Sequence, residues 1–98
     1  MSTVTVRMKV RPEREADFLK IFSDVADIVE TEEPDCVAYM VWETGTPHEY
    51  FLVESYRSDA GREEHNKRHA AVAQEFFACL DGPPETETLG RQVLGTPK

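Results

Sequence analysis

Two histidines follow an acidic residue and a tyrosine in the second half of this 98-residue chain. His65 and His69 are four residues apart in a segment with helical apolar periodicity, and Glu54 and Tyr56 are two apart in a strand-like segment. Residues with these spacings share one face of a helix or of a strand. If the two faces meet, a carboxyl group, a phenol and two imidazoles surround one apolar pocket, which is the composition of a small-molecule site.

Three of these residues are candidate catalytic groups. An imidazole exchanges protons near neutral pH, so His65 is the candidate general base. Glu54 could orient His65 and stabilise its charged form, as the acid of a catalytic triad does. Tyr56 could donate a hydrogen bond to a substrate oxygen or enolate. The structural alternatives are a histidine hydrogen-bonded to Glu54 or Tyr56 and a carboxylate that ties helix to sheet.

Tyr39, His69 and Phe76 are candidates for the substrate-binding wall, although aromatic residues of this kind more often pack in a core. His65 and His69 could also form a metal pair with Glu54 as the third ligand. This spacing alone is a weak metal signal, and the sequence has no further cluster of ligands. We therefore expect no metal.

The elements that must position these residues are readable from the apolar pattern. We expect strands over 4–10, 36–43, 49–57 and 86–94, and helices over 12–30 and 58–80, the second irregular near Gly61. This is the βαββαβ order of an α+β, ferredoxin-like fold with an antiparallel sheet. It predicts a single domain over 1–98, with a core at about 3–94 and a tail at 95–98.

The second strand is apolar on both faces. Tyr39 and its neighbours at alternate positions lie on one side, and Met40 and Trp42 lie on the other. Two helices can cover only one face, so the other would remain an apolar patch. The sequence therefore predicts a C2 homodimer in which two sheets pack face to face, with Met40 and Trp42 in the interface. The alternative is that loops or the tail cover this face.

Composition excludes several classes of partner. The chain has 19 acidic and 11 basic residues and a net charge of −8, which disfavours nucleic acid. No apolar run approaches the roughly 20 residues of a membrane span, and the N-terminus lacks the apolar region of a signal peptide. Cys36 and Cys79 are isolated, as expected of free thiols in a reducing cytoplasm.

The chain resembles the antibiotic biosynthesis monooxygenase family of dimeric α+β barrels over roughly residues 3–94. The resemblance rests on motifs along the whole chain: Arg11-Pro12-Glu13, Glu33-Pro34-Asp35-Cys36, the segment from Phe51 to Arg57, His65, and Asp81-Gly82-Pro83. It implies a cavity between sheet and helices that works without metal or prosthetic group. It also implies that a quinol or polycyclic phenol is oxygenated there, with O2 as co-substrate and His65, Glu54 and Tyr56 as the catalytic residues.

The sequence departs from the family pattern at two places. Only three residues separate His65 from His69, where the family commonly has four, including a proline. Val6 and Tyr56 stand where the haem-degrading branch has an amide and a tryptophan, which disfavours haem. Two other functions stay open. One is an isomerase of a small carbonyl or sugar-phosphate metabolite that uses the same base, and the other is a dimer that binds a metabolite without turnover.

Overall fold

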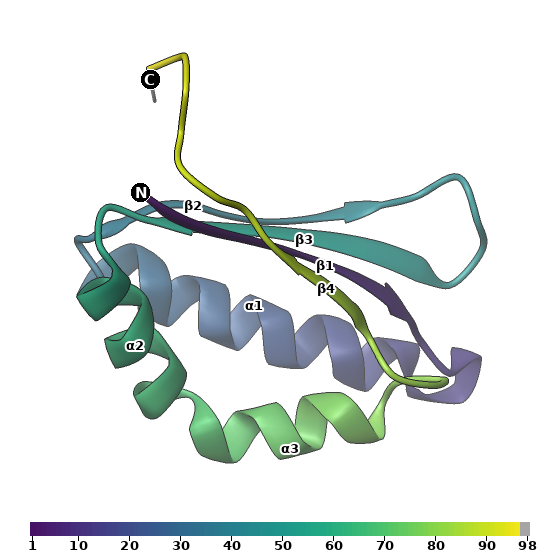
Figure 1. The fold of residues 1–98 in the computed structure, drawn as a ribbon. Helices are drawn as coiled ribbons and strands as arrows, with labels where there is room; N and C mark the ends of the chain where they lie inside the picture. Colours follow the sequence, from purple (N-terminus) through teal and green to yellow (C-terminus); the bar gives the residue numbers. More distant parts are fainter. Residues whose placement is uncertain (97–98) are drawn as a thin grey trace.

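A four-stranded antiparallel sheet with helices on one face forms the protein, as the computed structural model of residues 1–96 shows (Figure 1). The elements, in chain order, are β1 (Ser2–Lys9), η1 (Pro12–Arg14), α1 (Glu15–Glu32), β2 (Cys36–Glu43), β3 (Glu49–Tyr56), α2 (Asp59–Arg68), α3 (Ala70–Ala78) and β4 (Glu85–Thr88). The strand order in the sheet is β2-β3-β1-β4. The predicted α+β, ferredoxin-like fold is confirmed.

The helical segment after β3 is interrupted at His69, not near Gly61 as predicted. The Ser58 hydroxyl accepts a hydrogen bond from the Gly61 N–H, so this glycine lies in a capped first turn. A Cβ at position 61 would collide with the Asp35 carboxyl group, so the close approach of this side chain favours glycine there. His69 leaves helical geometry, with φ −103° and ψ 13°, and α3 turns away from α2 at this residue (Figure 1).

Two element boundaries also differ from the prediction. Pro12 begins a short 3-10 turn, and the α-helix itself begins at Glu15. The last strand covers only Glu85–Thr88 instead of 86–94. This edge strand consists of alternating glutamate and threonine, all exposed, so it has no apolar side chain to hold it against the helices. The backbone pairing with β1 ends before Gly90.

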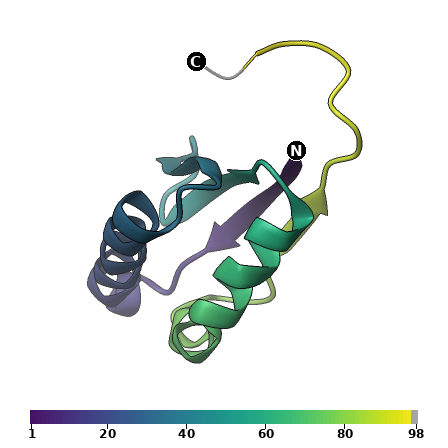
Figure 2. The same cartoon turned by 90° about the vertical axis from the view of Figure 1, so that its left-hand side faces the viewer.

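The helices lie side by side on one face of the sheet (Figure 2). Phe18 of α1 lies at the centre of the core and is fully buried, with its ring 5.0 Å from those of Phe22 and Tyr50. The other buried residues of this cluster come from β1 and the residue that follows it, from β3, and from the chain after α3: Met8, Val10, Leu52, Cys79 and Leu80. The core therefore fills one end of the space between sheet and helices, and the candidate site residues lie toward the other.

The opposite face of the sheet has no helix on it (Figure 1). Met40 pairs with Val53 and Trp42 with Phe51 across β2 and β3, and the Arg7 guanidinium lies 5.3 Å from the centre of the Phe51 ring. Met40 is 45% exposed and Trp42 57%, so this face presents apolar side chains to solvent in the single chain. Within residues 1–96, no helix combines the length and apolar character needed to cross a bilayer.

Candidate functional site

A cavity of about 290 Å³ lies between the helix-facing side of the sheet and the helices. Five of the six predicted site residues line it: Tyr39, Glu54, His65, His69 and Phe76. The sheet register explains how three strands reach it, since Glu54 pairs with Val4 on one side and Tyr39 on the other. Directly opposed residues share a face, so this row of three side chains forms the floor of the cavity.

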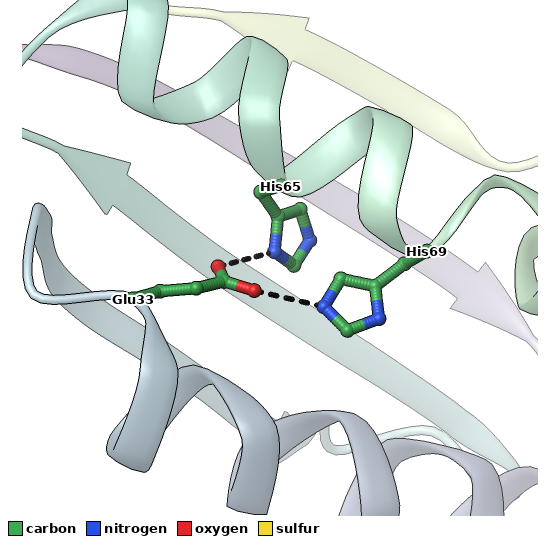
Figure 3. Close-up of side chains that lie close together, drawn as sticks. All are labelled: Glu33, His65 and His69. Carbon is green, nitrogen blue, oxygen red and sulfur yellow. Dashed lines mark hydrogen bonds and ion pairs between the residues drawn. The ribbon is translucent and has the colours of Figure 1, made fainter.

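The two histidines converge on a carboxylate that the sequence analysis did not select, Glu33. This residue follows the last turn of α1, and its side chain is only 7% exposed. One carboxylate oxygen lies 2.8 Å from His65 Nδ1 and the other lies 2.9 Å from His69 Nε2 (Figure 3). Tyr56 donates its hydroxyl hydrogen to the first oxygen at 2.9 Å, and Arg68 Nη1 donates to the second at 3.3 Å.

These contacts keep Glu33 ionised. Burial alone would raise the pKa of this carboxyl group, but the hydrogen bonds from His69, His65 and Tyr56 together lower it below its ordinary value. An ionised carboxylate can only accept hydrogen bonds, so both imidazoles must donate to it. His65 therefore carries a hydrogen on Nδ1. In the neutral ring, Nε2 then has a free lone pair, on the side of the ring away from Glu33 (Figure 3).

Tyr56 lies behind the cavity and does not line it. The residue is fully buried, its ring lies 5.4 Å from that of His65, and its hydroxyl is directed at Glu33. Burial first, and the hydrogen bond to Glu33 second, raise the pKa of this phenol far above its ordinary value. In this geometry Tyr56 supports the Glu33 carboxylate, whereas the sequence analysis placed it in contact with substrate.

Glu54 is not the partner of His65, in contrast to the prediction. Its carboxylate forms an ion pair with the Arg62 guanidinium of α2, with 3.5 Å between Oε1 and Nε. Arg62 precedes His65 by three residues, so the two side chains leave α2 on the same stripe. Arg62 pairs with Glu54, whereas His65 bonds to Glu33, the residue that follows α1.

The remaining predicted residues form the walls. The Tyr39 ring lies 5.4 Å from the His65 ring, and burial raises the pKa of its phenol well above the ordinary value. The His69 ring lies 4.6 Å from that of His65. Phe76 meets Phe22 edge to face at 5.2 Å, so it both packs in the core and closes the apolar wall.

Glu33 and the two histidines that contact it are also the candidate metal ligands. Ligand atoms of Glu33, His65 and His69 lie within 4.8 Å of one another, so Glu33, and not Glu54, would complete a set of two histidines and one carboxylate. The carboxylate oxygens already accept from both imidazoles and from the Tyr56 hydroxyl, at hydrogen-bond distances. An ion would have to replace the two imidazole hydrogen bonds.

Comparison with known proteins agrees with this architecture. The antibiotic biosynthesis monooxygenase family matches residues 1–75. A crystal structure from Caulobacter crescentus that carries the same family name is 27% identical, with a TM-score of 0.84 over 94% of this chain and 90% of that one. A Mycobacterium tuberculosis structure is 20% identical, with a TM-score of 0.86 over 97% and 98% of the two chains.

A conserved protein of Methanosarcina mazei is also similar in fold, at 18% identity and a TM-score of 0.84 over 93% of this chain and 92% of that one. No curated protein matches the chain. The family match covers three quarters of the sequence and includes Glu33, Glu54, Tyr56 and His65. The chain therefore belongs to the antibiotic biosynthesis monooxygenase family.

Proposed function

We propose that this protein is a cofactor-independent monooxygenase that oxidises a quinol or polycyclic phenol with O2. The observation that carries the proposal is the 2.8 Å hydrogen bond between His65 Nδ1 and the buried Glu33 carboxylate, at the wall of a largely apolar cavity. This pairing fixes the tautomer of His65 and leaves Nε2 as a base. Family membership supports an oxygenase-type activity.

In the proposed reaction, His65 Nε2 removes a proton from an activated phenol or ring C–H group, and Glu33 stabilises the resulting imidazolium. The electron-rich substrate anion transfers one electron to O2, which gives a substrate radical and superoxide. The two radicals combine into a C–O bond, and the imidazolium returns its proton to the peroxide. Loss of water from this hydroperoxide, with the hydrogen that remains on the same carbon, leaves a carbonyl group. The substrate therefore loses two hydrogen atoms and gains one oxygen atom, and the other oxygen atom of O2 leaves as H2O.

The other side chains exclude water and place the substrate. Tyr39, His69 and Phe76 provide the walls of the cavity, where an aromatic ring would stack. Tyr56 acts through Glu33, to which it donates its hydroxyl hydrogen. This role differs from the direct contact with a substrate anion expected from the sequence. Such chemistry depends mainly on the electronics of the substrate, so one base in a dry pocket is sufficient.

Oxygen uptake with a panel of quinols and anthrones tests the proposal. We expect oxygen uptake above the uncatalysed rate for at least one electron-rich aromatic. One O2 should be consumed for each new carbonyl group that mass spectrometry detects in the product. For a variant that lacks the proposed base, His65→Gln, the matched control is His48→Gln, because His48 is exposed at the turn before β3. Treatment with EDTA should leave the rate unchanged, whereas a rate that requires added metal would contradict cofactor independence.

Two other outcomes would replace the proposal. Solvent deuterium incorporation into a carbonyl substrate without oxygen uptake would identify an isomerase that uses the same base. A rise in melting temperature with aromatic ligands, without either reaction, would identify a binding module.

We also propose that the protein is a homodimer, with the sheet faces that carry Met40 and Trp42 packed together. Trp42 is 57% exposed in the single chain, and a tryptophan at the centre of an interface typically contributes about 2 kcal/mol or more. Trp42→Lys should raise the dimer dissociation constant about thirtyfold or more, as measured by light scattering across a concentration series. Leu19→Lys, at an exposed apolar residue of α1, should have no effect. A wild-type monomer at micromolar concentration would refute the interface.

A cytoplasmic location is the last part of the proposal. Cys36 and Cys79 are both free, and Cys79 is fully buried. Burial raises the pKa of the Cys36 thiol, which favours its protonated, less reactive form. Unreactive free thiols of this kind support a reducing compartment.

A further inference from the structure

The Arg62 guanidinium lies at the cavity without a hydrogen bond from its side chain to any residue among 1–96. Its Nε is the one buried side-chain nitrogen or oxygen in that range that lacks a partner. Glu54, across the cavity floor, also accepts no hydrogen bond, although its side chain is only 10% exposed. The two groups form an ion pair at 3.5 Å, too long for a well-made hydrogen bond.

The Glu54–Arg62 pair contrasts with Glu33, which meets α2 at His65, one turn after Arg62. Glu33 accepts hydrogen bonds from four side chains, so its capacity is filled within the protein. Buried polar groups are nearly always hydrogen-bonded, and a group without a partner commonly marks a place that a ligand or a water molecule fills. Both Arg62 and Glu54 line the cavity, and 28% of the Arg62 side chain is exposed, so a bound ligand can reach the guanidinium at its terminal nitrogens, away from the buried Nε.

We propose that Glu54 and Arg62 together bind one hydroxyl group of the substrate. A hydroxyl oxygen can accept a hydrogen bond from a terminal N–H of the Arg62 guanidinium while its hydrogen is donated to the Glu54 carboxylate, so one group can bond to both residues. A carboxylate or phosphate would satisfy Arg62 but would be repelled by Glu54. A methoxy oxygen could accept from Arg62 but has no hydrogen for Glu54.

This inference rests on the proposed function and narrows its substrate class. Arg62 and His65 lie on the same stripe of α2, one turn apart, and both line the cavity. A substrate whose first phenolic hydroxyl meets His65 would present a second hydroxyl to the Glu54–Arg62 pair. The preferred substrates are therefore neutral aromatics with at least two hydroxyl groups. Simple phenols and aromatic acids should bind less tightly.

Anaerobic calorimetry with three probes tests the inference: naphthohydroquinone, its monomethyl ether, and the analogue with a carboxylate in place of one hydroxyl. The ether keeps one hydroxyl for His65 but has no second hydroxyl hydrogen to donate. A second hydroxyl-binding site therefore favours the diol, and the variants below separate this preference from the steric effect of the methyl group. We expect wild-type protein to bind the diol about tenfold or more tightly than either analogue, since a hydrogen bond to a charged group contributes roughly 1.5–3 kcal/mol.

Two variants locate this preference. In Glu54→Met, and in the charge-neutral double variant Arg62→Met/Glu54→Met, the diol and the ether should bind equally, because the acceptor for the second hydroxyl hydrogen is gone. The double variant leaves no unpaired charge in the pocket, so it serves where the single variant does not fold, as judged by thermal melting. Lys67→Met is the matched control, because this exposed residue lies on the same helix, and it should retain the wild-type preference.

The outcomes separate the inference from the proposed function. Equal binding of diol and ether by wild-type protein overturns the hydroxyl site, even if oxygen uptake is observed. Tighter binding of the carboxylate analogue also overturns it and identifies an anion site instead. A preference for the diol without any oxygen uptake supports the hydroxyl site and refutes the monooxygenase. A preference that survives in both methionine variants shows that other residues recognise the hydroxyl, which refutes the assignment.

Discussion

Replacing His65 by glutamine should lower the kcat of oxygen uptake by about 10²–10⁴-fold, the usual contribution of a positioned general base. Glutamine can still donate an amide hydrogen to Glu33, so the cluster at the end of α1 keeps a partner at this position. It has no second basic nitrogen to accept a proton from substrate. The KM should change far less than kcat, because the apolar walls of the cavity are intact.

The matched control for His65→Gln is His48→Gln, which removes an exposed imidazole near Glu15 and should leave kcat unchanged. Circular dichroism and the melting temperature establish that both variants fold. Unchanged oxygen uptake in His65→Gln would remove this residue from the mechanism. If His65→Gln regains its kcat with a substrate that is already ionised in solution, the step lost in the variant is proton removal.

Local patterns explain why much of the fold could be predicted. Alternation in β1, β2 and β3 and the apolar stripe of α1 are properties of neighbouring residues, which the sequence displays directly. The same periodicity placed His65 and His69 on one face of a helix, and they do lie together. The break at His69 has no signal in the sequence, because neither glycine nor proline stands near it and the residue still donates its N–H to the His65 carbonyl, as in a helix.

The partners of the site residues could not be predicted in the same way. Glu33 lies 32 residues before His65, and its position after the last turn of α1, followed by Pro34, indicated only the end of a helix. No local pattern specifies which carboxylate a buried imidazole meets across a domain. The one available signal was that two histidines on a buried stripe require an acceptor. Glu54 was the carboxylate on an otherwise apolar strand face before this helix, but Arg62, one turn before His65 on the stripe of α2, pairs with it.

Glu33→Gln should have the largest effect on stability, because Glu33 is where α1, α2 and β3 meet. Four side chains donate to its two oxygens, and three of these donors are themselves buried: Tyr56, His65 and His69. A glutamine offers one acceptor oxygen and turns an NH2 group toward donors. We expect the free energy of unfolding to fall by about 2–4 kcal/mol, measured by urea denaturation, as expected for loss of buried hydrogen bonds to a charge. The exposed Glu30→Gln on the same helix should change it little.

The pH dependence of stability provides a second test of Glu33. In the folded protein the pKa of this carboxyl group lies below its ordinary value of 4.5, so ionisation is favoured by folding. The resulting stabilisation is fully present above the ordinary pKa and is lost as the pH falls through the lower folded value. Wild-type protein should therefore lose more stability than Glu33→Gln on acidification from neutral pH to below the folded pKa, and the gap between their unfolding free energies should narrow.

Glu15 and Glu49 also have lowered pKa values, through hydrogen bonds from Tyr50 and Thr44 respectively, so wild-type protein and Glu33→Gln share part of the acid sensitivity. Only the difference between the two proteins reports on Glu33. A gap that stays constant from neutral to acid pH would show that Glu33 is not held as a carboxylate by its neighbours.

The charge of Glu33 also matters for catalysis, because a neutral Glu33 could not stabilise an imidazolium at His65. Glu33→Gln should therefore also lower kcat, and this loss should persist at temperatures where the variant is fully folded.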